Sequence, residues 1–196
     1  MNYAPPLAAG DPTKAGRAIG AMFFSVFGGL WLALWANDQY PGFVALLIVA
    51  SCTAALLAVS YRVYKANSLA RKANAQTPES RLMSRRFNLI NGLQWGVIFL
   101  VAFALSRTGN ARWILPMIIF VVGVHFLPLA RVFEYRPHYV TGAALILLAS
   151  IYPIAAHDGP EDAIGALGAG LILWVSAAWA ISSTSSGRRS SVPHQP

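Results

Sequence analysis

Long stretches without charge are the feature that most constrains this sequence, because each is about as long as a lipid bilayer is thick. There are six, and each approaches the roughly 20 apolar residues that a membrane-spanning helix needs. They cover residues 18–37, 39–61, 87–106, 113–130, 137–157 and 163–187. These runs lack the period-two alternation of a β-barrel, and backbone groups in lipid must be paired internally. The sequence therefore predicts an all-α polytopic membrane protein, a bundle of six transmembrane helices.

The composition agrees with this prediction. Hydrophobic residues make up 56% of the chain and charged residues only 11%, whereas soluble domains carry about 25% charged residues. The net charge of +8 is typical of some nucleic-acid-binding proteins, but the distribution of the cations points to membrane topology instead. We therefore expect a lipid bilayer, and no nucleic acid, as the partner of this chain.

The cations alternate between the two ends of the predicted helices. Thirteen of the 15 Lys and Arg residues fall on one side, at Lys14, Arg17, Arg62, Lys65, Arg71, Lys72, Arg81, Arg85, Arg86, Arg131, Arg136, Arg188 and Arg189. Loops rich in Lys and Arg face the cytoplasm. The pattern predicts that both termini are cytoplasmic, and the economical size of the chain favours the inner membrane of a bacterium.

These observations divide the chain into an N-terminal cytoplasmic arm, a transmembrane domain and a disordered cytoplasmic tail. The arm covers 1–17, the domain 18–181 and the tail 182–196, with helices expected at 18–37, 41–64, 87–106, 113–133, 138–156 and 162–181. A basic cytoplasmic loop, 65–86, is expected to meet anionic lipid headgroups. Within it, Thr77-Pro78-Glu79 is a helix-start signal that predicts an extension of the third helix into the cytoplasm.

His125 is the most unusual ionisable residue inside the six stretches, because it lies in the cytoplasmic half of the fourth helix. Ionisable groups within a membrane are candidates for function. Pro128 follows three residues later, and a proline there leaves the carbonyl of Val124 without its usual partner. The sequence predicts a hinge beside a histidine.

A second polar group occurs at a matching depth on the third helix. Asn88, Asn91, Gln94 and Trp95 fall within roughly a 120° arc of an α-helix. The third and fourth helices are joined by a short loop and should pack together, so we expect Asn91 or Gln94 to hydrogen-bond the ring of His125. The alternative is that these side chains only hold the helices together.

Two further polar groups have simpler explanations. Arg131, Glu134 and Arg136 are candidates for a cytoplasmic gate or partner contact, although topology and surface pairing also account for them. At the opposite side, His157 is followed by Asp158, Glu161 and Asp162, and acids that open a helix are explained by capping and the helix dipole. We expect no metal site and no cofactor.

Small residues recur every four positions in three of the stretches. They are Ala21, Ser25, Gly29 and Ala33; Ala50, Ala54 and Ala58; and Gly165 with Ala169 and Ala166 with Gly170. Such stripes allow close helix packing in lipid. They indicate seams within the bundle or, alternatively, the interface of a homo-oligomer or of a larger membrane complex.

No familiar catalytic motif is present. The sequence has no H-E-x-x-H, G-x-S-x-G or P-loop, whose spacing carries the corresponding chemistry. A non-enzymatic role is favoured: binding or passage of a small solute through a polar pocket between the third and fourth helices, centred on His125, Asn91 and Gln94. One alternative is a non-catalytic accessory or regulatory subunit of a membrane complex, and another is a lipid-modifying enzyme with His125 as general base.

Overall fold

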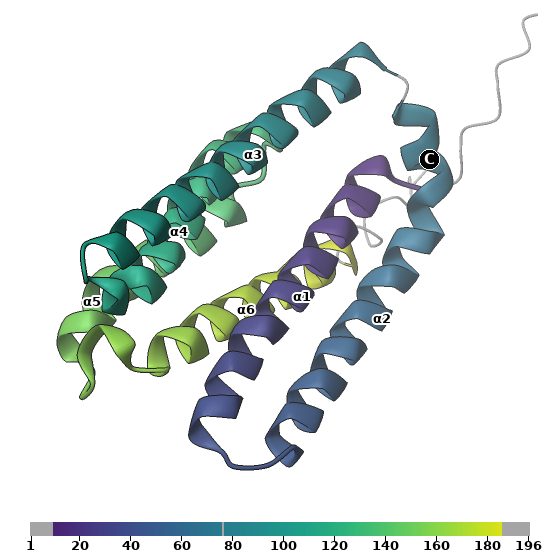
Figure 1. Cartoon of the computed structure of the whole chain (residues 1–196). Coiled ribbons are helices and arrows are strands. Elements are labelled where there is room, and N and C mark those ends of the chain that lie inside the picture. Colours follow the sequence, from purple (N-terminus) through teal and green to yellow (C-terminus); the bar gives the residue numbers. More distant parts are fainter. Residues whose placement is uncertain (1–9, 76, 186–196) are drawn as a thin grey trace, which may run out of the picture.

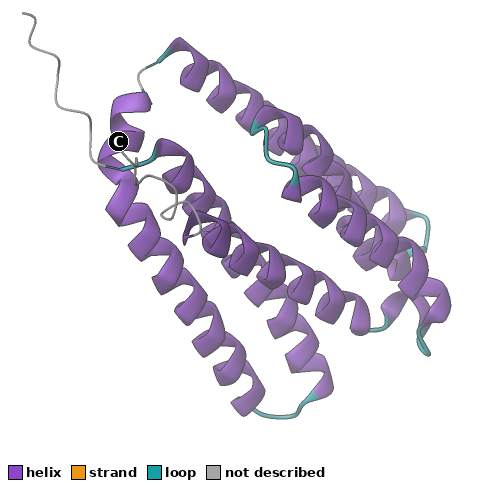
Figure 2. Cartoon of the chain, turned by 180° about the vertical axis from the view of Figure 1, so that it is seen from behind, coloured by secondary structure: helices purple, strands orange, loops and turns teal. Residues whose placement is uncertain are grey.

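The computed structural model describes residues 10–75 and 77–185, and all of the secondary structure in them is helical (Figure 2). The long helices are α1 (Pro12–Gln39), α2 (Val44–Asn74), α3 (Pro78–Arg107), α4 (Ile114–Val132), α5 (Pro137–Ala155) and α6 (Ile164–Ser185). Two 3₁₀ turns, η1 (Ala111–Trp113) and η2 (Gly159–Glu161), precede α4 and α6. All six long helices are long and apolar enough to span a membrane. The predicted all-helical architecture with six such helices is therefore confirmed.

At the charged side the helices extend beyond the apolar stretches, and the extension of α3 that the Thr77-Pro78-Glu79 signal predicts is confirmed. Most of the expected loop 65–86 is helical, because α2 continues to Asn74 and α3 begins at Pro78. Residues 65–74 contain neither Gly nor Pro, so nothing in them ends a helix. The side chain of Thr77 caps α3 by accepting a hydrogen bond from the N–H of Ser80 at 3.2 Å. The connection between α2 and α3 is therefore three residues long, 75–77.

The two ends of the chain also differ from the predicted boundaries. Residues 12–17 of the expected arm are the first turns of α1, where the carboxylate of Asp11 accepts a hydrogen bond from the N–H of Thr13 at 2.8 Å. At the other end α6 continues to Ser185, four residues into the expected tail. The predicted disorder of residues 186–196 lies outside the described residues.

The order of the helices in space differs from their order in the sequence. Helix α1 packs against α2 and α6, α4 packs against α3 and α5, and α5 meets α6. As a result, α2 and α3, which follow each other in the chain, lie at opposite edges of the molecule (Figure 1). Only 6% of the apolar window of each of these two helices is buried. Both edge helices therefore present apolar faces to their surroundings.

Glycines face the backbone of a neighbouring helix at two helix crossings. A Cβ on Gly28 of α1 would lie 3.0 Å from the carbonyl oxygen of Gly170 in α6, and a Cβ on Gly170 would lie 2.9 Å from that of Gly28. Gly123 of α4 and Gly142 of α5 face each other in the same way, at 3.0 and 2.8 Å. Backbones approach this closely only where side chains are absent. These two contacts fix α1 on α6 and α4 on α5.

The predicted small-residue stripes are largely buried in α1 and α6 but exposed in α2. In α1 and α6 their residues are largely buried, including Ala21, Ser25, Ala166 and Ala169, which confirms the prediction of seams within the bundle. In α2 the stripe of Ala50, Ala54 and Ala58 is exposed. For α2 an oligomer or complex interface remains a prediction.

One end of the bundle gathers the cations, and we call it the basic end. Helices α1, α3 and α5 begin there and α2, α4 and α6 end there. The N–H of Asp11, before α1, donates to Oδ1 of Asn67 in α2 at 2.9 Å. Phe87 of α3 contacts Phe133, just after α4, with ring centroids 5.8 Å apart. The candidate site lies at this end.

Candidate functional site at the basic end

His125 faces α3, as predicted, but it meets the backbone there and not the amides. The half-buried ring lies against the backbone at Ile90. Its Nδ1 atom is buried and has no partner among the described residues. Asn91 and Gln94 are partly buried on the same helix, yet no hydrogen bond in the described structure joins either to the ring. The expected amide–imidazole hydrogen bond is absent because the backbone of α3 approaches the ring first.

The other two residues of the predicted polar face turn away from α4. Asn88 is exposed, and Trp95 is 42% exposed and packs on Phe99 with ring centroids 6.0 Å apart. An arc of roughly 120° is wider than the strip by which one helix touches a neighbour. The structure therefore brings only half of the predicted face towards His125.

The remaining predicted residues lie on the surface at the end of α4. Helix α4 continues through the exposed Pro128 to Val132. Arg131, Glu134 and Arg136 are exposed, and Glu134 has a positive φ of 50° in the turn between α4 and α5. The only ion pair in the described part of the chain is elsewhere, between His157 and Asp158. The expected pairing of Glu134 with an arginine is therefore not formed.

His138, which the sequence analysis did not select, is more deeply buried than His125. It is the second residue of α5 and is 9% exposed. Its ring is surrounded by other rings, with centroids 5.0 Å away at Tyr135, 5.7 Å at Phe126, 5.8 Å at Phe24 and 6.1 Å at Phe133. His125 and His138 both pack on the Phe126 ring, each with ring centroids 5.7 Å apart. Helices α1, α4 and α5 thus enclose a histidine within an aromatic shell.

Arg17 of α1 completes this arrangement. Its guanidinium carbon lies 5.1 Å from the centroid of the Tyr135 ring, a cation–π distance. Its Nε atom is buried and has no partner in the part of the chain that the structure describes. We define the histidine–aromatic cluster as Arg17, Phe24, His125, Phe126, Phe133, Tyr135 and His138.

Unpartnered polar atoms are concentrated in this cluster. In the described residues, four buried side-chain nitrogen or oxygen atoms lack a hydrogen-bond partner: Arg17 Nε, His125 Nδ1, Tyr135 OH and His138 Nδ1. All four belong to the histidine–aromatic cluster. A buried polar atom without a partner costs about 1–3 kcal/mol, and native proteins nearly always pair such atoms with protein or water. The cluster therefore holds polar atoms whose hydrogen bonds the described residues do not supply.

A weak sequence signal for His138 and Tyr135 existed. Pro137 is a helix-start signal, and it places His138 in the first turn of α5 and Tyr135 just before it. Arg17 lies at the same end by the charge pattern. Hydropathy assigned all three to the aqueous boundary, and only the packing of α1 against the α4–α5 connection buries their polar atoms.

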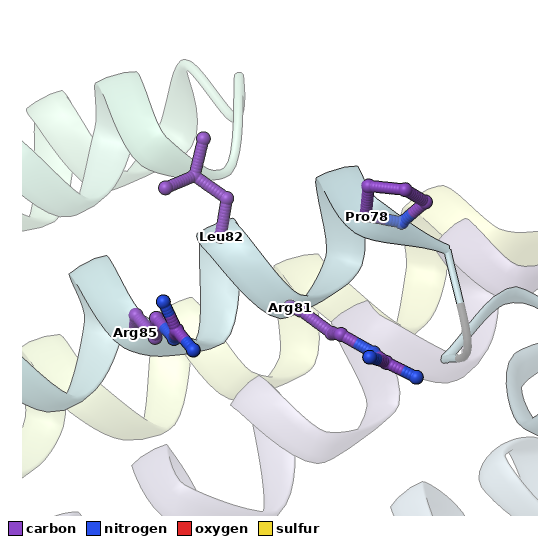
Figure 3. A pocket seen from close by; sticks show the side chains of 4 residues that line it. All are labelled: Pro78, Arg81, Leu82 and Arg85. Carbon is purple, nitrogen blue, oxygen red and sulfur yellow. The ribbon is translucent and has the colours of Figure 1, made fainter.

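Two open hollows of the described residues lie elsewhere. One, of about 330 Å³, is lined by Pro78, Arg81, Leu82 and Arg85 at the start of α3. Figure 3 shows Leu82 pointing away from the two arginines, which lie one turn apart. The other, of about 320 Å³, is apolar and lies between α2 and α6, lined by Ala55, Leu56, Val59, Ala178, Ile181 and Ser182. Neither includes the cluster.

The acidic group at the opposite end forms one local pair. Nδ1 of His157 lies 2.9 Å from Oδ1 of Asp158, and the His157 side chain is 96% exposed. This hydrogen bond to the carboxylate raises the pKa of His157 above its ordinary value of 6.5. Any stability that the pair contributes is complete below that ordinary value and is lost as the pH rises through the raised pKa.

We expect the substitution Asp158→Asn to lower the pKa of His157, because it removes the negative charge that favours the protonated ring. The measurement is an NMR titration of the His157 ring in the wild type and the variant. Asp38→Asn, at the far end of α1, is the matched control and should leave the titration in place. An unchanged midpoint in Asp158→Asn would show that the pair does not persist in solution.

Comparison of the chain with known proteins gave no match to a family, to a curated protein or to a solved structure.

Proposed function

We propose that this chain is an integral membrane protein that binds, or passes, a small polar solute at the histidine–aromatic cluster. The observation that carries the proposal is the concentration of four unpartnered buried polar atoms there. Leaving them unpaired is unfavourable, whereas a solute that pairs them gains affinity from the same atoms. Aromatic side chains together with a few polar groups are also the usual composition of a small-molecule site.

The proposal shifts the centre of the site from the α3–α4 contact to the space shared by α1, α4 and α5. His125 stays in it, and Asn91 and Gln94 remain neighbours on α3, whereas Asn88 and Trp95 are left out. In this proposal the two imidazoles supply switchable hydrogen bonds. Pro128 leaves the carbonyl of Val124 free beside His125, which favours bending of α4 at the site.

The proposed setting is the inner membrane of a bacterium, with both termini and the basic end in the cytoplasm. The asymmetric distribution of Lys and Arg supports this orientation. Arg81 and Arg85 line a hollow at the start of α3 (Figure 3), where anionic lipid headgroups would neutralise them. A solute would then reach the cluster from the cytoplasmic side, past the exposed connection between α4 and α5.

Native mass spectrometry of the full chain, extracted gently from its own membrane, tests the solute-binding proposal. The wild type is expected to retain a small molecule that the substitution His125→Ala releases. His157→Ala is the matched control, because it makes the same change at an exposed histidine at the opposite end. The proposal fails if the wild type carries no small molecule, or if both variants retain it equally.

A second candidate function is that of a non-catalytic subunit in a membrane complex. The observation that favours it is the exposure of α2 and α3, of whose apolar windows only 6% is buried. In that case the same mass spectra would show a second polypeptide at fixed stoichiometry. The substitution Ala54→Leu, in the exposed stripe of α2, should then weaken the complex, whereas Gly92→Leu on α3 separates the contribution of the two edges.

A further inference from the structure

We infer that the ligand of the histidine–aromatic cluster carries a negatively charged oxygen group, a carboxylate or a phosphate, and that Arg17 is its main counter-charge. The inference rests on the proposed function, since it names the chemical class of the solute bound at the same site. It depends on the position of Arg17, on the donors around it and on the absence of a neutralising acid in the described residues.

Arg17 supplies a permanent positive charge at the edge of the cluster. Its guanidinium group remains protonated in proteins. The group stacks on the Tyr135 ring, 5.1 Å from its centroid, while its Nε–H is buried and donates to nothing in the described residues. A guanidinium can only donate hydrogen bonds. The partner that this atom lacks must therefore be an acceptor, and a charged acceptor is the strongest one.

No acid of the described structure fills that place. The only ion pair in residues 10–75 and 77–185 joins His157 to Asp158 at the opposite end of the bundle. Asp11, the N-cap of α1 and the acid nearest to Arg17 in the sequence, accepts hydrogen bonds from the backbone of Thr13 and Lys14. Glu134 is exposed in the turn after α4. The charge of Arg17 is therefore left for a ligand to neutralise.

The other three unpartnered atoms suit the same ligand. The Tyr135 hydroxyl can donate, and both nitrogens of a histidine donate when the ring is protonated. An anion beside an imidazole favours that protonated form. A cationic ligand would be repelled by Arg17, and a neutral one would leave a partly buried charge unpaired, which is unfavourable. An anion can accept a hydrogen bond from Arg17, from Tyr135 and from each histidine whose Nδ1 carries a proton.

The rest of the cluster adds an apolar side to this ligand. Phe24, Phe126 and Phe133 complete the shell around His138. The exposed Arg131 and Arg136 flank the connection that leads to the cluster, and clustered cations attract anions from solution. The ligand is thus an oxyanion with an apolar body, and a free organic acid and a lipid headgroup both have this chemistry.

The test compares three probes of one size that differ in charge: benzoate, benzyl alcohol and benzylammonium. Thermal unfolding of the full chain in phosphatidylcholine nanodiscs is measured with each probe at constant ionic strength. Benzoate is expected to raise the midpoint and the other two are not. Arg17→Gln should weaken benzoate binding at least about tenfold, the loss of one charge-assisted hydrogen bond pair, and Arg17→Lys should restore part of it.

Arg107→Gln is the matched control. Arg107 also stacks on an aromatic ring, that of Phe103 at 5.6 Å, but it does so at the opposite end of the bundle. The substitution Arg107→Gln should therefore leave benzoate binding unchanged. If Arg17→Gln does not fold, the comparison of benzoate with benzylammonium on the wild type still decides the sign of the ligand charge.

A second arm separates the two sources of the anion. If the anion is a lipid headgroup, nanodiscs that contain phosphatidylglycerol raise the unfolding midpoint in an Arg17-dependent way. If the anion is a free organic acid, benzoate raises the midpoint in nanodiscs made of phosphatidylcholine alone. Either result supports the inference. Stabilisation by benzyl alcohol or benzylammonium equal to that by benzoate overturns the inference but leaves solute binding intact. If no probe or lipid acts and native mass spectra show no retained molecule, the proposed function fails as well.

Discussion

Replacing Gly123 with leucine is expected to force α4 away from α5 and to lower the free energy of unfolding by about 3 kcal/mol, at the upper end of the usual cost of overpacking. A Cβ at this position would lie 2.8 Å from Cγ1 of Ile146, 2.9 Å from its backbone nitrogen and 3.0 Å from the carbonyl oxygen of Gly142. A flexible side chain could move aside, but two of these three atoms belong to the backbone of α5. The helix itself must move.

Gly96→Leu is the control for this substitution. Gly96 lies on α3, and a Cβ there would meet no atom within 4 Å. Leucine is a better helix former than glycine by nearly 1 kcal/mol, and an exposed leucine on a membrane helix contacts lipid. We therefore expect Gly96→Leu to be neutral or slightly stabilising. Thermal unfolding of both variants in the same nanodiscs measures the difference, and equal midpoints would mean that α4 and α5 do not cross as closely as described.

The glycine crossings also explain which part of the fold could be predicted from sequence. The existence of six helices follows from the length of the uncharged stretches, since length and apolarity alone decide whether a helix spans. The spatial order of the helices does not follow. Lipid is as apolar as leucine, so hydrophobicity does not distinguish the buried face of a membrane helix from its exposed face. Pairs such as Gly28 with Gly170 decide the spatial order of the helices. One sequence does not reveal which glycine meets which.

The candidate site was predictable to a similar degree. His125 could be selected because a histidine deep in an apolar stretch is unusual. His138 could not, because it begins α5 at the boundary where histidines are ordinary. Its burial depends on Phe24, more than 100 positions earlier in the chain. The predicted amide partners also failed for a physical reason: the backbone of α3 at Ile90 reaches the His125 ring where a side chain was expected.

His138→Leu is expected to abolish retention of the solute and, at the same time, to stabilise the ligand-free protein by about 1 kcal/mol. The substitution removes a buried nitrogen that has no partner in residues 10–75 and 77–185, and such an atom costs about 1–3 kcal/mol. Leucine has a similar volume and keeps apolar contact with the surrounding rings. A residue that serves binding at the expense of stability is expected to show both effects when it is replaced: binding is lost and the empty protein becomes more stable.

Thr141→Val supplies the opposite case one turn further along α5. Thr141 is as buried as His138, but its hydroxyl lies 2.8 Å from that of Ser176 in α6 and also donates to the carbonyl of Pro137. Valine has the same shape but removes the Thr141 hydroxyl and both of these hydrogen bonds, so we expect a loss of about 1 kcal/mol. Thermal unfolding of both variants without ligand gives the sign of each change in stability. If His138→Leu is destabilising like Thr141→Val, then His138 holds the helices together and the cluster is part of the packing, because an imidazole that stabilises the empty bundle has no need of a ligand.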